Sequence, residues 1–401
     1  AYMQAAPRYF SSNAGILGSD LEARISDGSM QTIGLAEAII TGRAQDGGLF
    51  MPTHFPSVDL NAIMRMKDIP YSHFFVEVLK GFFEGVLSEK TLERIAEEAY
   101  KFKPLIEPIT KQDIIARLDE GPTVAFKDYA AQVFFRVVDA LMKEEPKSEV
   151  EFRQRIKEIK LLTYIVATSG DTGGAMGIGC HKMPNMWMAI LHSAFIPEHV
   201  RELQAKQMDT LGDNIYAIRI KTVFDGNASL ASKLEQDPDL RYMNMASANS
   251  VNIGRLLPQI AYYFYIYSQV AKNGEEIYVS VPSGNFGNAV AGLFARRMGL
   301  PIRLIIAVNE NDVFARFYNS GIYAPAAKTK SSPSNSINVN WPSNIRRLFQ
   351  LYGGQLIEGK DPDNPDRKVI SSLILPDLRM LRKEIAAYSI TDNETYDLVA
   401  E

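Results

Sequence analysis

The stretch LLTYIVATSGDTGGAMGIG, residues 161–179, decides the fold. Its first seven residues are mostly apolar or β-branched, which is typical of a buried strand in a parallel sheet. They run directly into TSGDTGG (168–174), a loop of small and hydroxyl-bearing residues that opens a helix. In an open α/β sheet, ligands bind at the carboxyl ends of the strands. This order of strand, loop and helix therefore predicts both an α/β fold and a binding loop.

A second unit of the same kind follows later in the chain. EIYVSV (276–281) predicts a strand, and PSGNFGNAVAG (282–292) predicts a glycine loop followed by a helix. The alternation of strands and helices predicts an α/β architecture with right-handed crossovers. We expect the other strands and the intervening helices at these residues: strands at 186–191, 215–220 and 302–308, and helices at 197–211, 255–272 and 288–298.

The first part of the chain reads differently, as helix and loop. Residues 30–42 show helical periodicity and end at Gly42, a plausible C-cap, and residues 87–102 form an amphipathic pattern with Ser88 as the expected N-cap. We therefore expect three parts with approximate boundaries: a mostly helical region at 1–110, a first α/β domain at 111–255 and a second at 256–401.

Composition excludes several classes of protein. The chain has 401 residues, of which 46% are hydrophobic and 22% charged, and its net charge is −4. No basic face indicates nucleic acid, no apolar run is long enough to span a bilayer, and the first ten residues resemble no secretory signal. The one cysteine, Cys180, fits a reducing compartment. We therefore expect a cytoplasmic protein with neither nucleic-acid nor membrane partners.

Common catalytic and metal motifs are missing from the sequence. The five histidines form no H-E-x-x-H pattern, and neither a G-x-S-x-G elbow nor a Walker A pattern is present. We therefore predict no metal site.

The two glycine loops suggest anion binding, since loop and helix-start N–H groups attract negative charge. Each loop alone could also be an ordinary tight βα turn. The loop 284–288 suits a compact phosphate monoester, and Thr168, Ser169 and Thr172 suit a carboxylate or a second phosphate. A nicotinamide-dependent dehydrogenase is a weaker alternative: the glycine spacing does not fit its fingerprint, although Glu310 lies at a suitable distance.

Two further segments carry candidate functional residues. In GPTVAFKDYAAQ (121–132), Lys127 stands in an apolar stretch where a helix begins. It could be a lysine whose stem covers the core while its ammonium reaches water, or a nucleophile tuned by burial. In SANSVNIGRLLPQ (247–259), Asn249 and Arg255 could bind phosphate or carboxylate, or Asn252 could cap a helix with Arg255 on a solvated face.

Together these segments resemble the threonine synthase family, pyridoxal-phosphate enzymes of the tryptophan-synthase β-like fold. The resemblance covers nearly the whole chain, because seven segments match the family's motifs in the same order: GRAQDGGLFMP (42–52), GPTVAFKDYAAQ (121–132), TSGDTGGA (168–175), SANSVNIGRLLPQ (247–259), PSGNFGNAVAG (282–292), NENDVFARFYNSGIY (309–323) and PSNIRRLF (342–349).

The resemblance implies a fold and a cofactor site. It implies fold type II, in which two open α/β domains hold pyridoxal 5'-phosphate between them. Lys127 would carry the cofactor as a Schiff base and act as the catalytic base. The remaining implied roles are as follows: Gly284, Asn285, Phe286, Gly287, Asn288 and Asp171 would bind the cofactor, and Thr168, Ser169, Gly170, Thr172, Asn249 and Arg255 would bind the substrate.

The activity implied is that of a lyase in threonine biosynthesis. It would convert O-phospho-L-homoserine and water into L-threonine and phosphate, by γ-elimination and addition of water at Cβ. A phospholyase that releases ammonia and phosphate would use the same residues, and a non-catalytic relative is a third alternative. The sequence does not distinguish a monomer from a homodimer.

Two departures from the family pattern stand out. The family usually continues past SITDNETYDLVAE (389–401) into a proline-histidine-threonine motif whose threonine meets the cofactor ring nitrogen. That motif is not among these residues, so the sequence assigns no partner to the ring nitrogen. The loop SPSNSINVN (332–340) also lacks the Met-Asp pair that many members show there.

Overall fold

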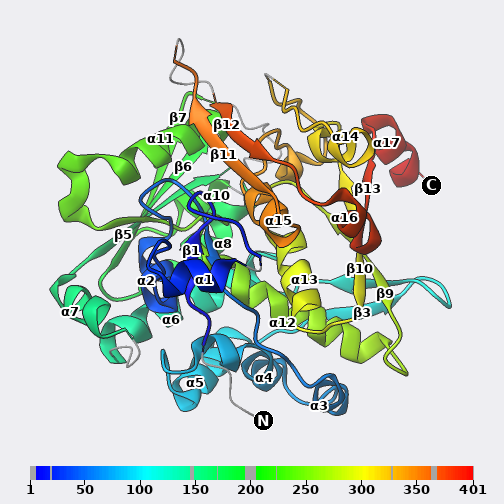
Figure 1. The fold of residues 1–401 in the computed structure, drawn as a ribbon, viewed down its shortest axis with the longest axis horizontal. Helices are drawn as coiled ribbons and strands as arrows, with labels where there is room; N and C mark the ends of the chain where they lie inside the picture. Colours follow the sequence, from blue (N-terminus) through cyan, green and yellow to red (C-terminus); the bar gives the residue numbers. More distant parts are fainter. Residues whose placement is uncertain are drawn as a thin grey trace.

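The computed structural model describes most of the chain (Figure 1). The described residues are 6–18, 20–144, 149–168, 170–194, 205–222, 224–326, 328–362 and 368–400.

A four-stranded parallel sheet forms around the strand that opens at residue 162. Its strand order is β7-β6-β5-β8, and every residue of β5 is buried. The strands predicted at 161–167, 186–191 and 215–220 are confirmed, and β8 is an addition: β5 (Leu162–Thr168), β6 (Met186–Ser193), β7 (Ile215–Ile220) and β8 (Met245–Ser247).

The two faces of β5 meet different helices. Tyr164 and Val166 belong to the main core, whereas Ile165 and Ala167 pack in a separate cluster with Ala231 of helix α11 (Phe224–Gln236). Side chains alternate across a strand, so a strand covered on both faces must be apolar throughout. This explains why the sequence pattern at 161–167 is a continuous apolar run.

A second parallel sheet lies on the opposite side of the molecule in the view of Figure 1. Its strand order is β13-β10-β9, and Ile306 pairs with Val281 on one side and Ala387 on the other. The strands predicted at 276–281 and 302–308 are confirmed, and β13 completes the sheet: β9 (Ile277–Pro282), β10 (Ile302–Val308) and β13 (Ile385–Ser389).

Helix α12 (Ile253–Val270) crosses the centre of the molecule and is buried along almost its whole length. The helices predicted at 255–272 and 288–298 are confirmed as α12 and α13 (Gly287–Arg297). The helix predicted at 197–211 lies mostly outside the described residues, and only α10 (Lys206–Asp209) of it is described.

The N-terminal region is mostly helical, as the sequence predicts. Gly42 ends α2 with φ +75°, and Ser88 caps α5 by accepting from the N–H of Thr91 at 3.1 Å. Its elements are α1 (Leu21–Ser26), α2 (Leu35–Thr41), α3 (Leu60–Arg65), α4 (Tyr71–Phe83) and α5 (Glu89–Ala99), with the antiparallel pairs β1 (Tyr9–Ser11) with β2 (Phe50–Pro52) and β3 (Leu105–Pro108) with β4 (Ile114–Arg117).

The remaining elements complete the two α/β parts. They are α6 (Asp128–Glu144), α7 (Val150–Glu158), α8 (Asp171–Cys180), α14 (Val313–Ser320), α15 (Ile345–Leu351), α16 (Leu378–Glu384), α17 (Asp392–Ala400), the hairpin β11 (Gln355–Lys360) with β12 (Lys368–Ile374), and the 3-10 turns η2 (Pro238–Met243) and η3 (Asn335–Ile337). The predicted divisions after residues 110 and 255 stay predictions. In the structure, the β3–β4 hairpin and helix α12 run across them. None of the described helices has the length and apolar character needed to cross a membrane.

Helices α6 and α8 approach each other closely because Gly179 has no side chain. A methyl group placed on Gly179 would lie 2.6 Å from the carbonyl oxygen of Ala131, which is backbone and cannot rotate away. The contact bears on the predicted site, because Lys127 directly precedes α6 and Asp171 begins α8. The packing of these two helices therefore fixes the starting points of both.

We expect Gly179→Ala to lower the free energy of unfolding by about 2 kcal/mol, since overpacking forces the backbones apart. Gly174→Ala, on the same helix, is the matched control. Its methyl group would meet only Oε1 of Gln207, the mobile end of a side chain, at 2.6 Å. Chemical denaturation of both variants checks this. Equal stabilities would contradict the role assigned to the helix contact.

Candidate active site

Lys127 stands at the start of α6, with its side chain in contact with an acid. Its carbonyl oxygen accepts from the N–H of Ala131 at 2.9 Å, which makes it the cap of the helix. Its Nζ lies 2.7 Å from Oδ1 of Asp171, and both side chains are about 15% exposed (15% and 16%). A lysine that only reaches into water is therefore not what the structure shows. The predicted position at the start of a helix is confirmed, and the structure adds an acid, Asp171, that faces the amine.

One pocket gathers most of the predicted site residues. It lies between the carboxyl ends of the two parallel sheets, where Ala167 is the last residue but one of β5 and Pro282 ends β9. The predicted residues that line it are Lys127, Thr172, Asn249, Arg255, Gly284, Asn285, Phe286, Gly287 and Asn288. Thr168, Gly170 and Asp171 lie beside it without lining it, and Ser169 falls outside the described residues.

The hydroxyl of Thr168 shapes its own loop. Its Oγ1 accepts from the N–H groups of Gly170 (2.9 Å) and Gly173 (3.0 Å), and it also donates to the carbonyl of Gly170 at 3.1 Å. The side chain is 1% exposed. In the structure Thr168 therefore holds the turn that leads from β5 into α8, and it has no free hydrogen-bonding capacity to offer a ligand.

Asn249 also ties two segments together. Its Oδ1 accepts from the N–H of Ala167 at 3.0 Å, and its Nδ2 donates to the carbonyl of the same residue at 2.8 Å. This pair of bonds joins the turn before α12 to the end of β5. Asn252, three residues later, caps α12 by accepting from the N–H of Gly254 at 2.9 Å. The capping alternative for Asn252 is thus confirmed.

Arg255 is a buried cation rather than a residue on a solvated face. It is 2% exposed, and Nη1 donates to the carbonyl of Ala248 at 2.6 Å. Its Nε has no hydrogen-bond partner. Burial lowers the pKa of Arg255 to about 10, and the charge of Asp171 opposes that shift. A buried guanidinium with unused donors at the wall of a pocket is suited to an anion that the pocket receives.

The loop after β9 offers a second place for an anion. Phe286, the N-cap residue of α13, adopts φ +63°, and the centroid of its ring lies 4.8 Å from that of Phe314. Left-handed backbone is costly for a residue with a side chain, and such strain collects at functional sites. The first N–H groups of α13, from Gly287 on, have no partner within the helix and can bind phosphate.

Two tyrosine hydroxyls bind the side chain of Asn288, near the start of α13. Its Oδ1 lies 2.6 Å from the hydroxyl of Tyr262 and 2.7 Å from that of Tyr263. Both tyrosines are on α12, the helix that also carries Arg255. The side-chain oxygen of Asn288 is therefore already used, and its side-chain Nδ2 and backbone N–H are the donors available to a ligand in the pocket.

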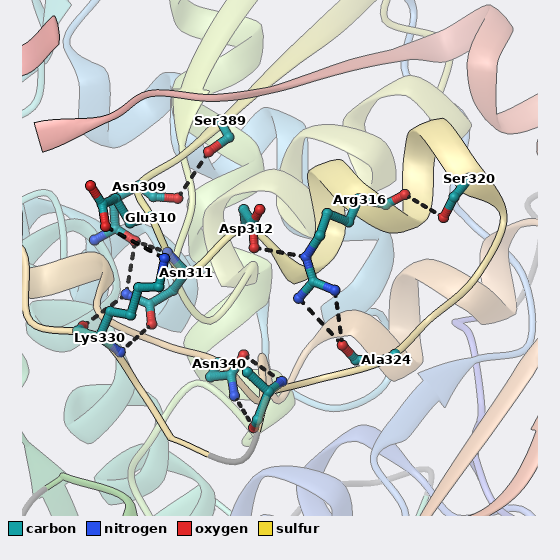
Figure 2. A network of polar contacts seen from close by, with 11 residues as sticks. Asn309, Glu310, Asn311, Asp312, Arg316, Ser320, Ala324, Lys330, Asn340 and Ser389 are labelled. Carbon is teal, nitrogen blue, oxygen red and sulfur yellow. Dashed lines mark hydrogen bonds and ion pairs between the residues drawn. The ribbon is translucent and has the colours of Figure 1, made fainter.

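Asparagine side chains hold the long loop at 328–344 in place (Figure 2). Asn311 donates from Nδ2 to the carbonyl of Lys330 at 3.0 Å, and the N–H of Lys330 donates to its Oδ1 at 2.8 Å. Asn309 donates to Oδ1 of Asn338 at 2.6 Å. These side-chain hydrogen bonds take the place of the backbone hydrogen bonds of a strand or helix. They hold the loop as one wall of the pocket.

Sequence reasoning did not name the residues that this loop contributes. Its pocket-lining members are Ser336, Ile337, Asn338 and Val339. The available signal was composition, since the Ser-, Asn- and Pro-rich stretch predicted a functional or mobile loop. Gly284 permits the contact: a methyl group on it would lie 2.8 Å from the Cα of Ile337.

Comparison with known proteins gives the site its context. The family model described as threonine synthase N terminus matches residues 25–100, and that described as pyridoxal-phosphate dependent enzyme matches residues 108–363. The threonine synthase of Escherichia coli is 31% identical over 334 residues, which are 82% of this chain and 74% of that protein. The chain belongs to the threonine synthase family.

Further relatives agree with this assignment. The threonine synthase of Buchnera aphidicola from Acyrthosiphon pisum is 35% identical over 80% of this chain and 72% of that protein. The crystal structure of yeast threonine synthase has a TM-score of 0.78 at 26% identity, over 98% of this chain and 78% of that one. A pyridoxal-phosphate-bound threonine synthase from Brucella melitensis has a TM-score of 0.77 at 26% identity, over 97% and 80%.

Membership in the threonine synthase family confirms the predicted fold type II, the class of pyridoxal-phosphate-dependent lyase and the cofactor. It leaves the nicotinamide-dependent alternative without support. The residues present also fit the cofactor: a lysine, a helix start able to bind phosphate and a buried arginine with an unpartnered Nε surround one pocket. Among the described residues, no group of three or more His, Cys, Asp or Glu side chains could hold a metal ion.

We expect Gly284→Ala to raise the dissociation constant of pyridoxal phosphate about tenfold or more, because its methyl group would displace loop backbone from the pocket wall. Gly287→Ala gives the graded comparison, since its methyl group would meet the Cβ of Ser250 at 3.3 Å. It should weaken binding less. Absorbance titration with the cofactor measures both. Wild-type affinity in Gly284→Ala would contradict the close loop contact.

Proposed function

We propose that this chain converts O-phospho-L-homoserine and water into L-threonine and phosphate. The observation that carries the proposal is one pocket that combines an amine, Lys127, with two separate places for phosphate, the start of α13 and Arg255. A cofactor phosphate and a substrate phosphate would require two such places. A cytoplasmic location fits the single buried cysteine.

Pyridoxal phosphate would be held at both of its ends by this chain. Lys127 would bind its aldehyde carbon, and the N–H groups of the loop at 284–288 would bind its phosphate. When bound, the cofactor supplies an electron sink for the negative charge that develops on the substrate.

Lys127 would move the protons of the reaction. Once its amine is free, it would take a proton from Cα and then from Cβ of the substrate, and protons would be returned to Cγ and Cα. The proton that water loses as its oxygen adds to Cβ would leave with the phosphate. Asp171, 2.7 Å from Nζ, would hold the side chain in position and stabilise the ammonium that forms. The two side chains are well shielded from solvent, which strengthens their attraction.

The substrate would be oriented by the other two loops. The start of α8 would meet its carboxylate through the hydroxyl of Thr172, which lines the pocket. Arg255 would bind the phosphate and stabilise its charge as the bond to Cγ breaks. Asn249 would act mainly by holding the turn before α12 against the end of β5, through its two hydrogen bonds to Ala167.

Product analysis tests the proposed reaction. Purified protein with added pyridoxal phosphate and O-phospho-L-homoserine should release one threonine for each phosphate. Ammonia and a keto acid in place of threonine would indicate the phospholyase. Absence of any phosphate release from the cofactor-loaded protein would overturn the proposal.

Arg255→Met keeps the length of the side chain and removes its charge. We expect it to raise KM for O-phospho-L-homoserine about 100-fold, since hydrogen bonds from a charged group to phosphate are among the strong ones. Inorganic phosphate should also lose its competitive inhibition. Arg136→Met on α6 is the control, because Arg136 donates to Gln132 on its own helix, forms an ion pair with Glu98 of α5 at 3.7 Å, and does not line the pocket. Unchanged KM in Arg255→Met would exclude the role assigned to Arg255.

A further inference from the structure

The segment 342–349 joins two sides of the pocket that are distant in sequence. On one side, Ser343 donates from Oγ to Oδ1 of Asn285 at 3.1 Å, and the N–H of Asn344 donates to the Asn285 carbonyl at 3.1 Å. On the other side, Nδ2 of Asn344 donates to Oγ of Ser250 at 3.1 Å. One residue, Asn344, thus contacts both pocket-lining loops.

Arg347, one turn further on, extends this junction. Its guanidinium donates from Nε to the carbonyl of Phe50 (3.0 Å), from Nη1 to Ser250 (3.2 Å) and from Nη2 to Val251 (2.7 Å). Nη1 also donates to Oδ1 of Asn344 at 2.6 Å. The side chain is 0% exposed. Only a planar group with five donors in fixed directions can serve four acceptors in this way.

Within the described part of the chain, no carboxylate forms an ion pair with the guanidinium of Arg347. Burial, together with the nearby charges of Arg346 and Arg43, lowers the pKa of Arg347 to about 9. A charge kept under these conditions is costly, so packing alone does not explain an arginine here.

Ser250 and Asn285 depend on this junction for their positions. Both line the pocket, and both lie in turns outside the helices and strands. Gly287, which begins α13, lies against the same place, since a methyl group on it would be 3.7 Å from Nδ2 of Asn344. The distance between the two turns is therefore set through side chains of the segment 342–349.

We propose that Arg347 and Asn344 are positioning residues that hold the turn at 249–251 and the loop at 284–288 at the spacing needed for two phosphate groups. The inference rests on the proposed function, in which the cofactor and the substrate each bring one phosphate. Neither residue lines the pocket, so both act through Ser250 and Asn285.

The neighbouring Arg346 provides a matched control. It is also buried, at 7% exposed, but it donates to the carbonyl of Gly47 at 2.8 Å and to Oε2 of Glu358 at 2.5 Å. It touches neither pocket loop through these bonds. Arg346→Lys and Arg347→Lys are thus the same change at adjacent buried positions, and only the second disturbs the junction.

The test compares these two variants in three measurements: melting temperature, the dissociation constant of pyridoxal phosphate, and kcat with KM for O-phospho-L-homoserine. We expect Arg347→Lys to raise the cofactor dissociation constant and KM about tenfold each, because lysine cannot keep the fork of hydrogen bonds. Arg346→Lys should lower the melting temperature and leave both constants within about twofold of wild type.

Asn344→Ala tests the same positioning role if Arg347→Lys does not fold. The Asn344 side chain makes no capping bond to α15, so its removal leaves the helix start intact. We expect about a tenfold rise in the cofactor dissociation constant. The control is Asn214→Ala, which removes bonds to the carbonyls of Cys180 and Met186 away from the pocket.

The outcomes separate the two proposals. Cofactor binding weakened in Arg347→Lys or Asn344→Ala, but not in their controls, supports the positioning role even if wild type turns over no O-phospho-L-homoserine. That last result would overturn only the proposed function. Wild-type cofactor affinity and KM in both folded variants would show that the junction is merely structural and overturn the inference.

Discussion

A positive charge removed from water requires compensation, and two arginines place this requirement at the centre of the molecule. Arg347 is surrounded by carbonyl and amide oxygens that its four hydrogen bonds reach. Arg255 is as deeply buried, yet its side chain has one bond and an unpartnered Nε at the wall of the pocket. The hydrogen bonds of Arg347 are used within the fold, whereas Arg255 keeps a donor for the phosphate that we propose it binds.

The position of the pocket follows from sheet topology. Parallel strands end at the same edge of a sheet, so the loops that leave β5 and β9 both present N–H groups and small residues there. The two sheets direct these edges toward one space, which α12 closes with Arg255. Close packing of α6 and α8 then places Lys127 beside Asp171. The proposed chemistry would thus use groups from four segments, none of which could form the site alone.

Much of this arrangement could be predicted from the sequence, because local pattern determines it. The apolar runs at 161–167 and 276–281 are strands, and the glycine loops follow them as expected. The missing parts depend on contacts between distant residues. No local signal showed that Asp171 would meet the amine of Lys127, that Asn249 would bind the backbone of Ala167, or that residues 336–339 would form a wall of the pocket. Composition marked the last of these as a loop of interest, but only tertiary structure gave it a location.

The proposed function depends most directly on Lys127 as the residue that holds the cofactor in this pocket. Borohydride reduction of the protein loaded with pyridoxal phosphate would fix the cofactor permanently to the lysine that binds it, and mass spectrometry of peptides would locate the label. After unbound cofactor is removed, we expect the protein to keep a visible absorption band that bleaches on reduction, with the label on Lys127. A label on another lysine, or a protein that retains neither band nor label, would rule this out.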